Sequence, residues 1–186
     1  MRKAVVLVSG GIDSAVALAW AKERFQVTAL SCEVAGRPRR EVRACAAVTR
    51  KAQAPLIRVR TPFLRPRGSG YVPARNLVFH AIALSVAEER GADAVVAGHN
   101  LSDASHFDDA RPSYFRRVES LGRGIRILLP FARYTDADVI MLGARLGVPL
   151  GITWSCYRDG ARPCRRCSAC RGRLESFRNA GMEDPS

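Results

Sequence analysis

Short apolar runs alternate with amphipathic segments along this chain, in the order expected of strands and helices. The run Lys3–Val8 predicts a strand, and Ser14–Arg24 has the spacing of a helix. The pattern continues, predicting strands at 27–32, 55–60, 94–97 and 125–129 and helices at 41–52, 73–90 and from residue 135 onward. Regular alternation of strand and helix is typical of a doubly wound parallel sheet, so we predict an α/β fold.

Local signals indicate where several of these segments begin and end. Pro73 suits the first turn of the long helix, and Gly91 follows its last turn. Thr135 is predicted to be an N-cap, because two aspartates follow it where the helix dipole favours negative charge. The segments 61–72 and 100–110 carry proline, glycine or polar residues and are predicted to be loops.

The pattern changes at about residue 153, because four of the six cysteines fall within residues 156–170. We therefore expect an α/β domain at 1–152 and a small appendage at 153–186 packed on it. No apolar run approaches the roughly 20 residues that span a bilayer, and the first apolar run is too short for a signal peptide. We expect a cytoplasmic protein that makes no membrane contact.

The chain carries a formal net charge of +13, from 30 Lys and Arg against 17 Asp and Glu. Such a charge attracts polyanions, including nucleotides and RNA. The excess is almost entirely arginine and is scattered, which favours a compositional origin such as a GC-rich genome. A nucleic-acid partner stays open but is not favoured, and a homodimer is also left open.

A glycine-rich turn follows the first predicted strand. Gly10 and Gly11 allow the main chain to approach a ligand closely. We predict an anion cradle here, formed by their main-chain amides, by the hydroxyls of Ser9 and Ser14 and by the positive end of the helix that begins near Asp13. The turn has neither Walker A nor Rossmann spacing, and an ordinary tight turn is the other interpretation. The hexapeptide resembles the SGGxDS loop of the PP-loop ATP pyrophosphatases, which implies that it holds the pyrophosphate end of ATP. Its members are Ser9, Gly10, Gly11, Ile12, Asp13 and Ser14.

The C-terminal cysteines have the spacing of a metal site. Cys156, Cys164, Cys167 and Cys170 can close a tetrahedral site of four thiolates, which predicts structural zinc. An iron–sulfur cluster is an alternative, whereas a reducing compartment disfavours disulfides. The two remaining cysteines, Cys32 and Cys45, are interpreted as core thiols.

Four further motifs and the hexapeptide occur in the order found in one enzyme family. They are YVPARNLVF at 71–79, GHNLSDASHFDDARP at 98–112, LGVPLGITWSCY at 146–157 and the four-cysteine tail. Together they resemble the motifs of the 7-cyano-7-deazaguanine synthase family. The resemblance covers nearly the whole chain and implies an α/β ATP-binding domain of the PP-loop type with a C-terminal zinc site.

The resemblance also implies a reaction. Members of that family convert 7-carboxy-7-deazaguanine, ammonia and ATP into a nitrile precursor of queuosine and archaeosine. Adenylation gives the carboxylate a good leaving group, and the cradle stabilises the departing pyrophosphate. Two alternatives stay open: a PP-loop enzyme that adenylates a tRNA base, and a catalytically silent, zinc-bearing nucleic-acid-binding protein.

The resemblance assigns roles to individual residues. The hexapeptide would bind the ATP phosphates, with Asp13 also a partner for Mg²⁺. Arg75 and Asn76 would face the active site, and three residues of the polar segment would recognise the deazaguanine and its carboxylate, namely Asp103, Asp109 and Arg111. A carboxylate suits the donors of a guanine edge, and an arginine suits a carboxylate. The catalytic candidates are Asp13, Asp103 and Arg111.

The chain departs from the family pattern at three sets of residues, and its loop before Tyr71 is short. It has Ala110 where the family has a cysteine, Asp136 where the family has a lysine, and a different segment at Ser31–Glu41. Loss of a lysine beside a triphosphate should weaken ATP binding unless another cation substitutes, and Arg133 is the nearest candidate.

The three histidines differ in their predicted surroundings. His80 lies within the long helix, where a structural role is expected. His99 and His106 flank the predicted substrate segment, and either could help to bind substrate.

Overall fold

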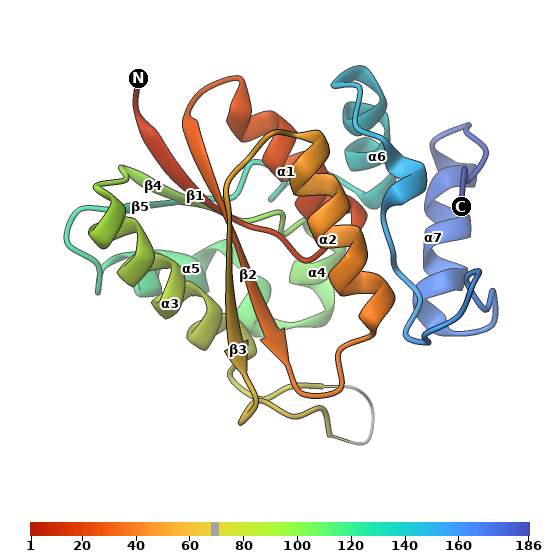
Figure 1. The fold of residues 1–186 in the computed structure, drawn as a ribbon, viewed down its shortest axis with the longest axis horizontal. Helices are drawn as coiled ribbons and strands as arrows, with labels where there is room; N and C mark the ends of the chain where they lie inside the picture. The colour runs from red at the N-terminus through yellow and green to blue at the C-terminus, as the bar shows by residue number, and fades with distance from the viewer. Residues whose placement is uncertain (68–70) are drawn as a thin grey trace.

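The computed structural model describes residues 1–67 and 71–186 and confirms the doubly wound sheet (Figure 1). Five strands pair in parallel in the order β3-β2-β1-β4-β5. They are β1 (Lys3–Leu7), β2 (Gln26–Val34), β3 (Leu56–Thr61), β4 (Ala94–Val96) and β5 (Arg126–Leu128). The strand order reverses between β1 and β4, and such a switch point is where open parallel sheets bind ligands.

Helices cover both faces of the sheet (Figure 1). One face carries α1 (Ile12–Lys22), α2 (Arg39–Lys51) and α6 (Asp136–Arg145), and the other carries α3 (Arg75–Arg90) and α5 (Pro112–Glu119). The remaining helical segments are α4 (Leu101–His106), η1 (Asp108–Ala110), η2 (Leu150–Ile152) and α7 (Ser168–Asn179). None of the helices in the described ranges has the length and apolarity needed to span a membrane.

The two faces of the sheet bury separate hydrophobic cores. Val6 faces the core shared with α1 and α6, whereas Val5 faces the core shared with α3 and α5, because successive strand residues point to opposite faces. Phe177 of α7 is 1% exposed and packs into the first of these cores.

The C-terminal segment is attached to the α/β core by buried polar contacts. The guanidinium of Arg173 donates to the carboxylate of Asp184 at 2.9 Å, to Thr153 Oγ1 at 2.8 Å and to the Leu150 carbonyl at 3.1 Å. The N–H of Trp154 donates to the carbonyl of Gly10 at 2.9 Å. The division of the chain at residue 152 stays a prediction.

Two predicted helix ends are confirmed and one is corrected. Thr135 caps α6 through a reciprocal pair of hydrogen bonds with Asp138, and Gly91 ends α3 with a φ of +58°. The prediction that Pro73 lies in the first turn of α3 is wrong. Ala74 has a left-handed φ of +53°, so the helix begins only at Arg75.

The prediction of a loop over 100–110 is also wrong, because this segment forms α4 and η1. Asn100 caps α4: its side-chain oxygen accepts the Asp103 N–H at 3.1 Å, and the Asp103 carboxylate accepts the Asn100 N–H at 3.4 Å. This capping box uses Asn and Asp in place of the more familiar Ser or Thr and Glu. In the other predicted loop, at 61–72, residues 68–70 lie outside the described residues.

Candidate active site

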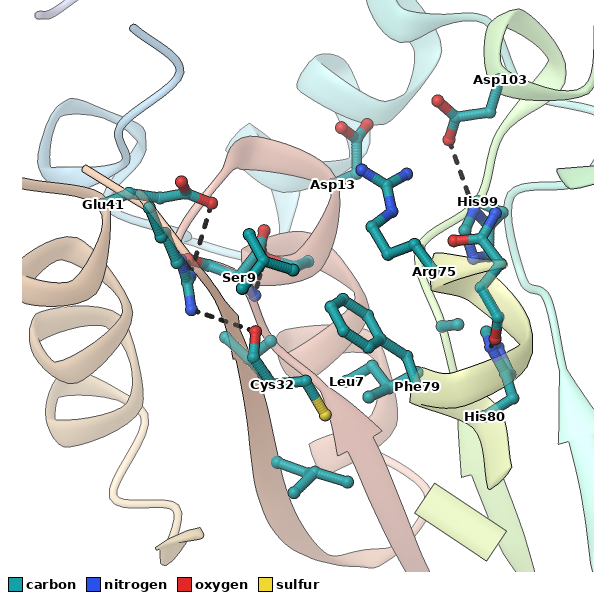
Figure 2. A pocket seen from close by; sticks show the side chains of 18 residues that line it. Leu7, Ser9, Asp13, Cys32, Glu41, Arg75, Phe79, His80, His99 and Asp103 are labelled. Carbon is teal, nitrogen blue, oxygen red and sulfur yellow. Dashed lines mark hydrogen bonds and ion pairs between the residues drawn. The ribbon is translucent and has the colours of Figure 1, made fainter. Parts of the chain in front are cut away.

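A cavity of about 330 Å³ opens at the carboxyl ends of β1, β2 and β4, at the switch point of the sheet (Figure 2). It brings together six of the residues predicted from the sequence: Ser9, Asp13, Ser14, Arg75, Asn76 and Asp103. Apolar side chains from the strands and from α3 form much of its wall, including Leu7, Leu30, Val34 and Phe79. We call the turn at residues 9–14 the phosphate loop, after its predicted role. Such a loop beside an apolar wall can hold a molecule with an anionic end and a planar, apolar body.

The turn between β1 and α1 gathers its polar groups around two hydroxyls. Ser14 Oγ accepts the N–H groups of Ser9 and Gly10 at 3.1 and 3.2 Å, and it donates to the Gly11 carbonyl at 3.0 Å. Ser9 Oγ accepts the Gly11 N–H at 3.2 Å. Three main-chain N–H groups therefore converge on these two hydroxyls at the start of α1, where an anion could replace the hydroxyls as the acceptor.

Close packing fixes this turn from behind. Gly10 has a φ of +97°, and a Cβ at this position would lie 2.6 Å from both the Cys45 nitrogen and the Glu41 oxygen. A Cβ at Gly98 would lie 2.7 Å from the carbonyl oxygen of Asp13. Glycine at both positions lets α2 and the end of β4 lie directly against the phosphate loop.

Three aspartates lie around Asn100, which is 2% exposed: Asp103 accepts its main-chain N–H, and Asp13 and Asp136 accept its side-chain amide. We call these three residues the aspartate cluster. Asn100 Nδ2 donates to Asp13 Oδ1 at 3.1 Å and to Asp136 Oδ1 at 2.7 Å. Ser102 Oγ donates to the other oxygen of Asp136 at 2.8 Å. Asp136 is therefore built into this polar cluster.

The cluster changes the acidity of Asp13. Burial and the nearby carboxylates of Asp103 and Asp136 raise the pKa of Asp13 to about 7, although the Asn100 hydrogen bond opposes the shift. A cation placed here would relieve the repulsion among the carboxylates and favour the ionised form of Asp13.

Arg37 is a cavity residue that the sequence did not single out. Its guanidinium, with the side chain 6% exposed, donates to the Ser9 carbonyl and to Ser31 Oγ, the latter at 2.9 Å, and lies 3.4 Å from a carboxylate oxygen of Glu41. The divergent segment 31–41 thus supplies a cation that lies against the phosphate loop. The Arg-x-x-x-Glu spacing at a helix start is the signal that could have revealed this pair. Arg133, the predicted substitute cation, lines a separate depression with Tyr134.

The remaining predicted substrate residues lie outside the cavity lining. Asn76 Nδ2 donates to the Asp109 carbonyl at 3.1 Å and so connects α3 to η1. Arg111 is exposed and lies 3.0 Å from Asp108 in an ion pair. Ala110, the last residue of η1, is buried, with 3% of its surface exposed. The substrate roles of Asp109 and Arg111 stay predictions.

The histidines divide between the cavity and the surface. His80 and His99 both line the cavity, whereas His106 is exposed and its ring contacts the Ser102 carbonyl at 2.8 Å. His99 Nδ1 lies 3.6 Å from an Asp103 carboxylate oxygen, and Figure 2 shows the two side chains pointing toward each other.

The four predicted cysteine ligands converge in the C-terminal segment. Their sulfur atoms all lie within 4.8 Å of one another, and Cys164 Sγ lies 3.9 Å from Cys170 Sγ. A tetrahedral ion with metal–sulfur bonds of about 2.3 Å separates its sulfurs by about 3.8 Å. Cys156 Sγ accepts the N–H groups of Arg158 and Cys164 at 3.4 Å, and such bonds stabilise a thiolate. The cluster could therefore hold a metal ion.

Comparison with known proteins identifies relatives over nearly the entire chain. The family model of the queuosine biosynthesis protein QueC matches residues 3–70 and 65–181. A 7-cyano-7-deazaguanine synthase from Synechococcus sp. (strain CC9902) is 37% identical over 216 aligned residues, covering 98% of this chain and 96% of the relative. The enzyme of the same name from Thermoplasma acidophilum is 35% identical, covering 99% of this chain and 91% of the relative.

Among solved structures, the NMN synthetase from Francisella tularensis has a similar fold. It superposes with a TM-score of 0.59 and 14% identity, over 98% of this chain and 78% of that structure. At this level of identity the similarity concerns the fold alone.

Proposed function

The chain belongs to the family of the queuosine biosynthesis protein QueC, and on this premise we propose that it is a 7-cyano-7-deazaguanine synthase. The proposed reaction is an ATP-dependent ligation that converts 7-carboxy-7-deazaguanine and ammonia into the nitrile 7-cyano-7-deazaguanine. Both relatives described above bear that enzyme name and match this chain almost from end to end.

One structural observation carries the proposal: the phosphate loop, the aspartate cluster and the apolar wall meet in a single cavity at the switch point. An enzyme that adenylates an acid on a planar heterocycle needs these three parts side by side. The loop N–H groups would hold the pyrophosphate of ATP, and the apolar wall would hold a flat ring.

The chemistry requires two activations of the same carbon. In the first, a carboxylate oxygen attacks the α-phosphorus of ATP and pyrophosphate leaves, so that ammonia can displace AMP and form the amide. In the second, the amide oxygen attacks another ATP, and loss of AMP with a proton yields the nitrile. The loop would stabilise the negative charge that develops on pyrophosphate in both activations.

We further propose that Mg²⁺ accompanies ATP at the aspartate cluster. Asp13 is the candidate ligand, because its carboxylate faces the cavity, lies in the first turn of α1 and shares Asn100 with Asp136. Carboxylate oxygens are preferred ligands of Mg²⁺, and the ion would neutralise charge on the phosphates. Arg75, Asn76 and Asp103 are proposed to face the substrate from the other side of the cavity.

The direct test uses purified protein with 7-carboxy-7-deazaguanine, ATP, Mg²⁺ and an ammonium salt. We expect mass spectrometry to show AMP and the nitrile, with two AMP formed per nitrile. When ammonium is left out, AMP release should slow strongly because the acyl adenylate has no nucleophile. Absence of AMP and nitrile under the complete conditions would rule the proposal out.

For the four-cysteine cluster we propose structural zinc. Four thiolates satisfy the tetrahedral preference of Zn²⁺ and leave no ligand position open for chemistry. Unpaired thiols at such a site also fit the reducing cytoplasm, which we propose as the compartment. The homodimer and the nucleic-acid partner that the sequence leaves open are not part of the proposal.

Cys170→Ser should remove the metal and loosen the C-terminal segment. Cys170 is 3% exposed and follows Cys167 at the start of α7, so loss of its thiolate breaks the cluster where it joins this helix. We expect metal content to fall from one ion per chain to less than about a tenth, and the unfolding temperature to fall by about 5 °C or more. Elemental analysis and thermal unfolding measure both effects.

Cys45→Ser provides the matched control for this experiment. Cys45 is an equally buried thiol of α2 that lies outside the cluster, with its sulfur 3.4 Å from the Val8 carbonyl. This variant should keep a full complement of metal. Equal metal content in the two variants would contradict the assignment.

A further inference from the structure

Three aromatic rings lie against one another beside the cavity. The His99 ring lies 4.6 Å from the Phe115 ring and 5.6 Å from the His80 ring, and the His80 ring lies 4.5 Å from the Phe115 ring. Phe115 is 2% exposed and His80 is 1% exposed, so the stack is anchored in the core behind α3. Two imidazoles are thus held in fixed positions among residues that line the cavity.

The two imidazoles are not equivalent. His80 Nδ1 lies 2.8 Å from the Asn76 carbonyl and must carry the proton of that bond, and its buried Nε2 has no hydrogen-bond partner among the described residues. Burial, and to a smaller degree His99, lowers the pKa of His80 to about 3, so this ring stays neutral. His80 therefore serves as a wall for His99 and does not take up a proton.

His99 has the surroundings of a base. It lies three residues after the end of β4, lines the cavity and is partly exposed, so a proton can pass from it to solvent. Its Nδ1 faces the Asp103 carboxylate, which assigns the ring proton to Nδ1 and leaves Nε2 as the basic nitrogen. Besides Asp103 and His80, the ionisable residues that line the same cavity are Asp13, Cys32, Arg37, Glu41 and Arg75.

Asp103 is itself held in place. It occupies the third position of the α4 capping box, so its side chain is fixed by the main chain of Asn100. Burial raises the pKa of Asp103, but His99, the Asn100 N–H and Arg75 together outweigh burial and leave the pKa below its usual value. An ionised carboxylate that orients an imidazole and stabilises its charged form is the arrangement of a general base and its positioning residue.

We propose that His99, oriented by Asp103, accepts the proton that ammonia loses when it attacks the activated carboxyl group. This inference rests on the proposed function. In the step, a carbon–nitrogen bond forms, the bond from the acyl carbon to AMP breaks, and AMP leaves with the electron pair. One N–H proton passes to His99 Nε2 and then to solvent. Asp103 acts as the positioning residue.

The test reads two half-reactions of His99→Gln separately. Adenylation, followed as exchange of labelled pyrophosphate into ATP without ammonia, should stay within about threefold of wild type because the phosphate loop is untouched. Amide formation in a single turnover with ammonium should fall by about 10²- to 10⁴-fold, the usual contribution of a general base. Asp103→Asn, which leaves the ring stack intact, should lower the rate of amide formation in the same assay.

A further readout separates proton transfer from a structural role. Hydroxylamine, whose conjugate acid is far stronger than ammonium, should reduce the deficit of His99→Gln to about tenfold or less.

His106→Gln is the matched control, because its ring is exposed and lies outside the cavity lining. It should behave as wild type in both half-reactions. The inference is overturned if His99→Gln forms amide at the wild-type rate, or if its adenylation rate falls as far as its rate of amide formation. Neither result bears on the proposed function, which fails only if the wild-type protein makes neither AMP nor nitrile.

Discussion

Gly10→Ala is expected to abolish turnover and to destabilise the fold. The new Cβ would lie 2.6 Å from main-chain atoms of Cys45 and Glu41, and neither belongs to a flexible side chain that could move away. The φ of +97° adds strain for any residue with a side chain. We expect a loss of about 2–5 kcal/mol in the free energy of unfolding and at least a 100-fold loss of AMP formation. Denaturant unfolding and the AMP assay measure the two effects.

Gly124→Ala separates backbone strain from the clash. Gly124 also has a positive φ, +79°, but a Cβ there would meet nothing within 4 Å. It lies between α5 and β5, away from the cavity, so the variant should lose only about 1 kcal/mol and keep its activity. If the two variants were equally stable and equally active, the close packing of α2 against the phosphate loop would not matter.

Asp13→Asn is expected to stabilise the protein without Mg²⁺ while removing its activity. The pKa of Asp13 is about 7 in the folded protein, against 3.8 when unfolded. Ionisation of Asp13 therefore destabilises the fold, and this destabilisation grows as pH rises from about 4 to 7. Replacing it by a neutral amide should raise the free energy of unfolding at pH 8 by about 2–4 kcal/mol, with little effect at pH 4. Loss of the proposed Mg²⁺ ligand should lower AMP formation at least about 100-fold.

Asp138→Asn should respond with the opposite sign. Hydrogen bonds from Thr135 lower the pKa of Asp138, so its ionised form stabilises the fold above pH 4 and this contribution is lost on acidification. Unfolding free energies of Asp13→Asn and Asp138→Asn, each measured at pH 4 and pH 8, therefore test both expectations together. A stability gain in Asp13→Asn that does not change with pH would contradict the role of charge repulsion.

The sheet and its main helices could be predicted from the sequence because their signals are local. An apolar run such as Lys3–Leu7 predicts a strand, and Thr135 and Gly91 form their caps from neighbouring residues. The cysteine cluster was equally predictable, since ligand spacing alone places four thiols near one another. By contrast, α4 was missed because its residues are polar and its cap is an unusual Asn–Asp pair.

The cavity was predictable only in part, because several of its residues meet through the sheet topology. The phosphate loop lies within six consecutive residues and could be identified directly. His80 and His99 come together because α3 packs beside the end of β4, and no spacing in the sequence expresses that contact. Likewise, sequence proximity favoured Arg133 as the extra cation, whereas the connection between β2 and α2 brings Arg37 to Ser9.

The hydrogen bond from Trp154 to Gly10 joins the two proposed ligand sites through the main chain. Trp154 stands two residues before Cys156, so disorder that starts at an empty thiolate cluster can spread to the loop that takes up ATP. If loss of the metal weakens nucleotide binding, thermodynamic reciprocity requires that a bound nucleotide strengthens retention of the metal.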